Sequence, residues 1–299
     1  MYKQIASNKR KAIFFIFLFV ILILALGFIF GYVTDLGYFG VGLAGIIAIG
    51  YGLIGYYSGD KFILFISGAR QVTRKNARPI YNLVENLCIA SGLPVPKIYV
   101  IPDPSPNAFA TGRDPKHASI ALTSGIIKKL EKAELEGVIA HELSHIKNFD
   151  IRLTSIIVIF VGIVALLSNW LLRMSFFGRG RRRRGGGGQI GLILLLIGLA
   201  LAIFSPLVAR LIQFALSRKR EFLADASGAM ITRYPEGLAR ALEKISSDST
   251  PLQRVNHTTA HLYISNPLRR QKGWLTKLYS THPPIEERIK ALRKMSENI

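Results

Sequence analysis

The sequence predicts an α-helical, multi-pass membrane protein with one α+β domain outside the membrane, and this domain is interrupted by a membrane hairpin. Half of the 299 residues are hydrophobic and only 19% are charged, which is unusual for a soluble chain and too apolar for a disordered one. The apolar residues are concentrated in four long uncharged runs. Mixed helix and strand patterns fill the segments 58–152 and 217–299, which together are long enough for one globular core.

The uncharged runs cover residues 12–32, 36–57, 153–172 and 185–209. Each has close to the roughly 20 residues that a helix needs to cross the hydrocarbon core of a bilayer. The first run follows three basic residues, as a signal peptide would, but it is too long, lacks a cleavage site of small residues and is followed at once by the second run. We therefore predict two retained transmembrane helices in 1–57 and a transmembrane or membrane-embedded hairpin in 153–216.

The basic residues around the runs predict the orientation. Lys and Arg are frequent before the first run and after the second, whereas the connection between these runs has only Asp35. By the positive-inside rule, the amino terminus and the segment 58–152 face the cytoplasm of a cell (plasma or inner) membrane. The loop after the third run disagrees, because it carries six arginines: Arg173, Arg179, Arg181, Arg182, Arg183 and Arg184. Three explanations stay open: a hairpin that dips only part-way, a loop tolerated outside, or an inverted orientation.

The formal charge of +21 comes from 39 Lys and Arg residues against 18 Asp and Glu residues. Many basic residues lie beside the ends of the apolar runs, where they attract anionic lipid headgroups. The Arg/Gly-rich stretch 179–188 lacks the interleaved aromatic residues that stack on nucleic-acid bases, so we predict no nucleic-acid partner. The single cysteine, Cys88, excludes an internal disulfide framework and fits a reducing compartment.

The segments outside the membrane predict both helices and strands. Proline in a first turn marks one helix start, and short stretches rich in β-branched and aromatic residues mark strands. The predicted strands are 97–101, 108–112 and 119–123, and the predicted helices are 79–90, 125–130, 132–148, 217–232, 235–246 and 284–295.

The helix predicted over 132–148 carries the motif His141-Glu142-x-x-His145. Residues four apart on a helix share a face and lie about 6 Å apart along its axis, so the two imidazoles can bind one tetrahedral Zn²⁺. Glu142, beside the first ligand, can take a proton from the attacking water and later deliver it to a leaving amine. Such a string also arises by chance, but here it lies on an otherwise apolar helix and a candidate third ligand follows downstream.

Glu221 is a candidate for that third ligand, since a catalytic zinc takes three protein ligands and keeps one open position. It lies four residues before Asp225 on the next predicted helix, so Asp225 can bond the outer nitrogen of a ligating histidine. An ordinary charged helix face is the alternative. Other candidates for the third ligand are His257, His261 and His282. One zinc ion per chain follows, and the two motifs must then lie on the same side of the membrane, close to its surface.

Several motifs together resemble the HtpX family of membrane zinc metalloproteases, which is related to the CAAX prenyl proteases. The resemblance covers nearly the whole chain and rests on HELSHIKNFD at 141–150, EFLAD at 221–225, PNAFATGR at 106–113 and THPP at 281–284. It implies a gluzincin-type (zincin) metalloprotease domain in two halves, 58–152 and 217–299, with zinc on His141, His145 and Glu221. It further implies cytoplasmic proteolysis of misfolded or damaged membrane proteins, as part of protein quality control under stress.

The resemblance also implies roles for residues outside the metal site. Asn107, Ala108, Phe109 and Ala110 would form an extended edge beside the cleft, to which a substrate backbone adds as a strand. Asn107 is otherwise a plain turn residue. His282 would be a second catalytic residue that stabilises the oxyanion of the tetrahedral intermediate, or else a histidine that begins a helix.

The hypothesis is therefore a membrane zinc endopeptidase whose partners are polypeptide substrates, above all membrane proteins, and the lipid bilayer. Two alternatives stay open. The same residues would serve the processing of one defined substrate, such as a lipidated tail. A non-catalytic scaffold with structural zinc would need a fourth protein ligand, for which His282 and His261 are candidates.

Overall fold

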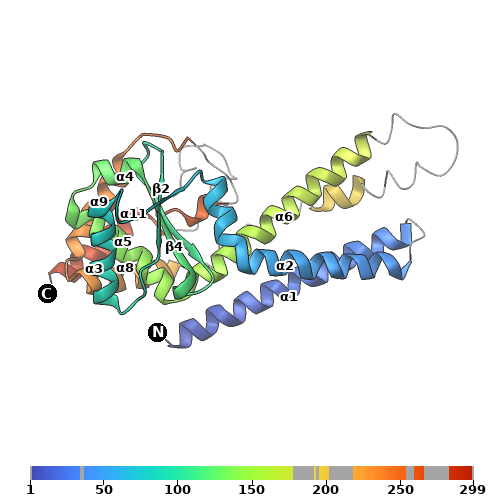
Figure 1. The fold of residues 1–299 in the computed structure, drawn as a ribbon, viewed down its shortest axis with the longest axis horizontal. Coiled ribbons are helices and arrows are strands. Elements are labelled where there is room, and N and C mark those ends of the chain that lie inside the picture. The colour runs from blue at the N-terminus through green and yellow to red at the C-terminus, as the bar shows by residue number, and fades with distance from the viewer. Residues whose placement is uncertain are drawn as a thin grey trace.

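The computed structural model describes residues 2–33, 37–177, 192, 195–201, 218–253, 259–265 and 283–297. Three long helices extend from a globular part (Figure 1), namely α1 (Tyr2–Val33), α2 (Tyr38–Ile66) and α6 (Asp150–Phe177). Within the described chain, these three are long and apolar enough to cross a membrane. Of the fourth predicted run, 185–209, the structure describes residue 192 and the helical residues 195–201, and the Arg/Gly-rich stretch lies outside the described residues.

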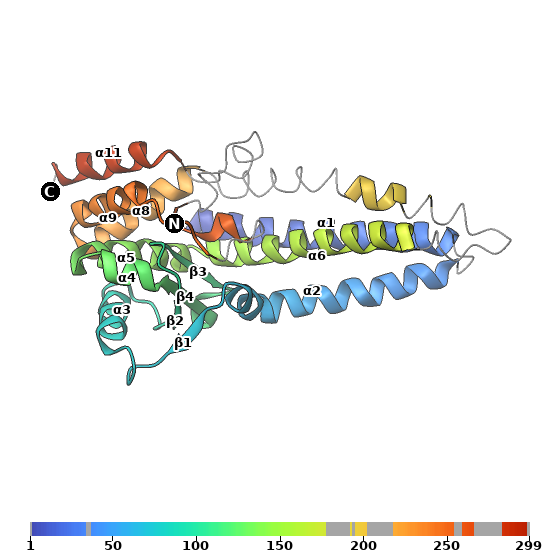
Figure 2. The ribbon, with the colours of Figure 1, turned by 90° about the horizontal axis from the view of Figure 1, so that it is seen from above.

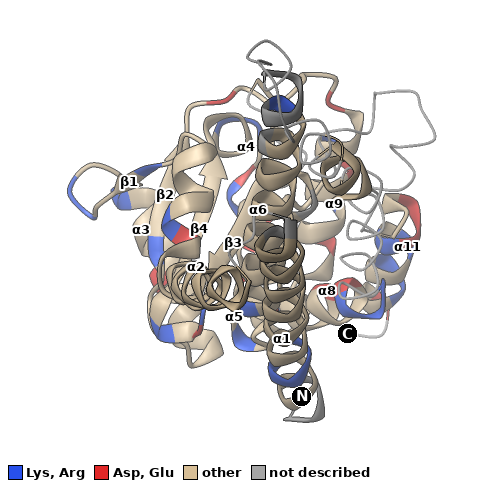
Figure 3. Ribbon diagram, turned by 90° about the vertical axis from the view of Figure 1, so that its right-hand side faces the viewer, with Lys and Arg blue, Asp and Glu red and all other residues tan. Residues whose placement is uncertain are grey.

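The three long helices pack closely on one another. A Cβ atom on Gly27 of α1 would lie 2.1 Å from the Cβ of Ala44 on α2, so only glycine permits this approach. The ring of Phe19 on α1 stacks on Phe160 of α6 with centroids 4.1 Å apart. Seen along the helices, charged residues are sparse on all three and basic residues gather at the start of α1 (Figure 3). Their outer surfaces expose large apolar side chains, as contact with lipid requires.

The globular part contains a four-stranded sheet with the order β1-β2-β4-β3. Its strands are β1 (Arg70–Val72), β2 (Lys97–Ile101), β3 (Ala108–Gly112) and β4 (Ala118–Thr123). β2 and β4 are parallel, the other two pairs are antiparallel, and β3 forms one edge. The sequence does not predict β1, because three residues are too few for an alternation pattern and the strand exists only through its pairing with β2.

Among the described residues, the globular part also contains the α-helices α3 (Arg78–Ser91), α4 (Ser124–Lys129), α5 (Lys132–Lys147), α8 (Arg218–Thr232), α9 (Pro235–Ser247) and α11 (Ile285–Ser296). Two short 3-10 helices cover Pro115–His117 and Ala260–Leu262. Each predicted helix and strand boundary in this part differs from the observed one by at most one residue. Local signals explain this agreement: Glu131 and Glu134 form a capping box at the start of α5, and Gly92 ends α3 with a left-handed φ of 69°.

The sheet lies between a layer of helices and the base of the long helices (Figure 2). On one face, Ile120 and its neighbours pack against α3, α5, α9 and α11 in the main hydrophobic core. On the other face, Phe109 and Tyr263 meet edge to face, and Ile63 of α2 and Val158 of α6 pack beside them. α2 therefore continues nine residues beyond the predicted end of its apolar run at 57, and its last turns join the core of the globular part.

Candidate metal centre

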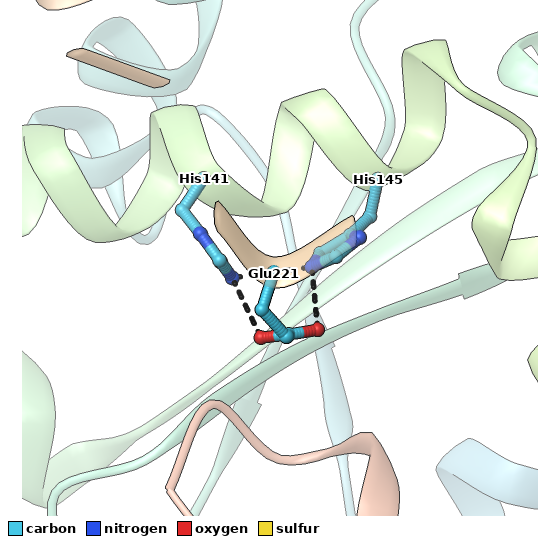
Figure 4. Close-up of side chains that lie close together, drawn as sticks. All are labelled: His141, His145 and Glu221. Atoms are coloured by element: carbon cyan, nitrogen blue, oxygen red, sulfur yellow. Dashed lines mark hydrogen bonds and ion pairs between the residues drawn. The ribbon is translucent and has the colours of Figure 1, made fainter. Parts of the chain in front are cut away.

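Helices α5 and α8 bring His141, His145 and Glu221 together (Figure 4). The Nε2 atoms of the two histidines are 3.1 Å apart. One oxygen of Glu221 lies 3.8 Å from His141 Nε2, and the other lies 3.6 Å from His145 Nε2. Among the described residues, this is the group of histidine and carboxylate side chains whose ligand atoms converge, all within 4.8 Å of one another. The structure thus joins the two motifs that the sequence analysis paired.

A close backbone approach places α8 over α5. A Cβ atom on Gly228 would lie 3.0 Å from the backbone nitrogen of His141, which leaves little room for any side chain there. Likewise, a Cβ atom on Gly137 of α5 would lie 2.7 Å from the backbone nitrogen of Leu238 on α9. The two glycines allow the helices to approach until Glu221, two turns before Gly228, reaches the histidines.

Each histidine is held from behind by a carboxylate. His141 Nδ1 lies 2.9 Å from Asp225 Oδ1, as the spacing of the second motif predicted. His145 Nδ1 lies 3.0 Å from Asp150 Oδ2, and the sequence analysis missed this partner. Because a carboxylate accepts hydrogen bonds, each Nδ1 carries a proton, and Nε2 is the atom of each ring that faces Glu221 and can bind a metal ion.

Asp150 is the last residue of the HELSHIKNFD motif, and it follows the turn at the end of α5. That turn contains Phe149 with a left-handed φ of 58°, which reverses the chain so that Asp150 faces back toward His145. Helical spacing alone places residues 145 and 150 on different faces, so the contact is invisible to a periodicity argument.

The converging atoms fit a metal ion. The Nε2 atoms of two imidazoles and a carboxylate converge on one point, so positive charge between them, as a metal ion or as a proton on a histidine, balances the charge of Glu221. The raised pKa of His145 also indicates that this site favours positive charge. Burial disfavours its charged ring, but the hydrogen bond to Asp150 and the negative charges of Glu221, Asp150 and Glu142 outweigh burial and raise the pKa to about 9. The donor set of two imidazoles and one carboxylate is that of many catalytic zinc sites.

Arg288 of α11 balances the carboxylates from the far side, and the sequence analysis missed it. Its side chain is fully buried, and its Nε and Nη2 donate to the two oxygens of Asp225 at 2.8 and 2.7 Å. Its Nη1 lies 3.7 Å from Glu221 Oε2. Burial alone would raise the pKa of Asp225, but the Arg288 charge and hydrogen bonds, with those of His141, hold it at about 2.

Glu142 directly follows the candidate ligand His141 on α5 and is only 3% exposed. Its negative charge raises the pKa of both His145 and Arg288, so it lies within electrostatic reach of the centre. His282 and His257 lie outside the described residues, as does the side chain of His261.

The predicted substrate edge corresponds to β3 and the residue before it. The Asn107 side chain is only 3% exposed and bonds the backbone of Ser265, with its Nδ2 donating to the carbonyl at 2.9 Å. Since the Asn107 carbonyl accepts from Thr123 of the β4 strand, the backbone groups of Ala108 and Ala110 point away from that strand. The Ala108 carbonyl accepts from Ile264 at 2.9 Å, which leaves Ala110 as the predicted residue at which a further strand would pair.

An HExxH helix, a third ligand on a following helix and an α+β domain on long apolar helices define a membrane metallopeptidase of the zincin type. The comparisons with known proteins agree. The family model "Peptidase family M48" matches residues 74–296, and the chain belongs to this family.

Two relatives illustrate the match. "Protease HtpX homolog" of Dictyoglomus thermophilum is 47% identical over 296 residues, which cover 99% of this chain and 95% of the relative. The homolog of the same name from Listeria monocytogenes (serovar 1/2a, strain EGD-e) is 43% identical over 304 residues, covering 99% and 100%. A crystal structure of Ste24p from S. mikatae shares the fold, with a TM-score of 0.51 at 17% identity over 98% of this chain and 67% of that one. The predicted family and fold class are thus confirmed.

Proposed function

We propose that this chain is a membrane-integral zinc endopeptidase that hydrolyses misfolded or damaged membrane proteins at the cytoplasmic face of the cell membrane. The convergence of His141, His145 and Glu221 beside the start of a membrane helix carries the proposal. His145 lies only five residues before Asp150, where α6 begins. A peptide segment that leaves the bilayer next to α6 therefore meets the centre within a few residues.

The chain's own groups supply the proton transfers. When bound, zinc acts as a Lewis acid that acidifies water and polarises a peptide carbonyl. Glu142 accepts a proton from the attacking water on its carboxylate and then donates it to the leaving amide nitrogen. Asp225 and Asp150 keep the two imidazoles in the tautomer that directs Nε2 at the metal. In this proposal His282 stabilises the oxyanion that develops on the carbonyl oxygen.

The β3 edge holds the substrate. An extended chain adds to this edge through the backbone N–H and C=O of Ala110, while Asn107 anchors the neighbouring segment at Ser265. The all-buried strand contacts both α5 and α6, so a peptide paired with it runs between the metal centre and the membrane helices. This arrangement favours extended, locally unfolded substrates.

The cytoplasmic location rests on charge. Basic residues precede the apolar part of α1 and follow α2, and these two helix ends lie beside the globular part (Figure 1). Two halves, 58–152 and 217–299, form the metallopeptidase domain in this proposal, and the hairpin 153–216 connects them.

The test is cleavage of an unfolded protein such as casein by the detergent-purified full chain, with Glu142→Gln as the matched variant. We expect the wild type to cleave and to contain one zinc per chain. The variant should lose at least about 10³-fold in rate, because the proton acceptor is gone, while it retains the metal. Metal content is measured on the same samples. Equal cleavage by both proteins would contradict the mechanism, and loss of the metal in the variant would make Glu142 a structural residue instead.

A further inference from the structure

The first turns of α1 contact Asp150, the carboxylate that bonds the candidate metal ligand His145. Asn8 lies before the uncharged run of this helix and is only 1% exposed. Its Nδ2 donates to Asp150 Oδ1 at 2.7 Å and to the backbone carbonyl of Asn148 at 2.9 Å. The amino terminus accordingly lies beside the globular part in both views (Figures 1 and 2).

One carboxylate oxygen of Asp150 contacts α1, and the other contacts the metal centre. Oδ2 accepts from Nδ1 of the ligand His145 at 3.0 Å, whereas Oδ1 accepts from Asn8 and lies 3.3 Å from Arg220 Nη1. A carboxylate held at one oxygen is restricted in its rotation, so the direction of the other oxygen is restricted as well. The contacts form a chain from Asn8 through Asp150 to the ring of His145.

The same turns of α1 support the strained turn between α5 and α6. Phe149 adopts a left-handed φ of 58°, which a bulky residue rarely does and which persists only where neighbours hold it. Lys9 of α1 places its Nζ 4.8 Å from the centre of the Phe149 ring. Asn8 and Lys9 therefore hold all three residues of the turn, 148–150, from one helix.

The hydrogen bonds of Asn8 also explain why a polar side chain is buried here. Its Oδ1 is buried without a hydrogen-bond partner among the described residues, so the side chain is stabilised only through its Nδ2 donor. On packing grounds alone an apolar residue would suit the site better.

We propose that Asn8 is a positioning residue for the metal ligand His145, acting through Asp150, and that the first membrane helix is thereby a structural part of the metal centre. The inference rests on the proposed metal site and adds to it the dependence of metal binding on α1. It also implies that the membrane anchor and the peptidase chemistry are not separable modules.

The experiment measures zinc affinity of the full detergent-solubilised chain by competition with a chromogenic chelator. Asn8→Leu keeps the volume but removes the donor, and it should weaken zinc binding about tenfold, at the low end of the range for groups that hold a ligating histidine. The visible spectrum of the Co²⁺-loaded protein, which reports ligand geometry, should change with it. Asn8→Ala is measured alongside, so that a folding failure of one variant leaves the other.

Two comparisons separate positioning from general damage. Phe19→Leu loosens the packing of α1 on α6 away from the centre and should leave zinc affinity and the Co²⁺ spectrum unchanged. Asp150→Asn should weaken zinc binding by about 10- to 100-fold, and adding Asn8→Leu to it should cost less than about twofold more, because Asn8 acts through Asp150.

The outcomes are distinct. The proposal is supported if both Asn8 variants bind zinc more weakly, if Asn8→Leu adds little to the loss caused by Asp150→Asn, and if Phe19→Leu binds zinc like the wild type. It is overturned by wild-type affinity in the Asn8 variants, by an equal effect of Phe19→Leu, or by additivity with Asp150→Asn. A wild type that binds no metal would overturn the proposed metal site and this inference with it, whereas tight wild-type binding with unchanged variants overturns the inference alone.

Discussion

Arg288→Met should destabilise the protein more than any surface substitution on the same helix. The guanidinium is fully buried, 2.7 and 2.8 Å from the oxygens of Asp225 and 3.7 Å from Glu221. Methionine fills most of the volume but removes the buried positive charge that pairs with Asp225 and lies beside Glu221. Breaking a buried ion pair in this way costs about 3–5 kcal/mol. For a domain of this size, such a loss lowers the melting temperature by about 10 °C.

The single cysteine provides the assay. Cys88 lies in the main core, 1% exposed, so a fluorogenic maleimide reacts with it only when the globular part unfolds. Melting curves are recorded in detergent with a chelator present, because a bound metal would itself balance the charge of Glu221.

Arg293→Met is the matched control on α11. Arg293 is half-exposed and pairs with Glu236 and Glu243 at the surface, where ion pairs contribute little, so its loss should hardly change the melting temperature. In the double variant Arg288→Met/Asp225→Asn, which removes both charges, part of the lost stability should return. The reasoning fails if the two arginine variants melt within about 2 °C of each other.

Two further expectations concern close packing and the buried thiol. Gly228→Ala should lower the free energy of unfolding by about 1–3 kcal/mol and weaken metal binding, because its Cβ would lie 3.0 Å from the His141 backbone. Gly162→Ala, whose Cβ meets nothing within 4 Å, should change neither quantity. An equal loss of stability in both variants, measured by Cys88 melting curves, would contradict this. Burial raises the pKa of Cys88 to about 12, so the thiol stays protonated between pH 7 and 9 and iodoacetamide should label it only after unfolding. Labelling of the native chain at the rate of a free cysteine peptide would refute that expectation.

Local patterns account for the parts of the fold that were predicted well. The helix that carries His141 and His145 begins at a capping box, and its apolar residues recur at helical spacing to its end. Residues within the segment therefore predict where the helix begins and ends. The strand Ala108–Gly112 was likewise predicted at its observed bounds. β1 was missed because pairing with a distant strand, and not its own three residues, makes it a strand.

The candidate ligands could be predicted for a geometric reason. Residues four apart on a helix share a face, and this spacing alone pairs His141 with His145 and Glu221 with Asp225. The chemistry of imidazole and carboxylate then indicates a metal.

The residues that contact the candidate ligands from behind could not be predicted by helical spacing. Arg288 meets Asp225 from 63 residues away, and Asn8 meets Asp150 from 142 residues away. No periodicity links such residues, because the contacts depend on a left-handed turn at Phe149 and on helices that approach closely at Gly228. The sequence by itself determined the three long apolar helices, the candidate metal ligands and the helices that carry them, since these depend on residues near one another in the chain. Only the tertiary structure decided which carboxylates, which arginine and which long helix lie against the candidate ligands and their partners, since those contacts exist only after the chain has folded back on itself.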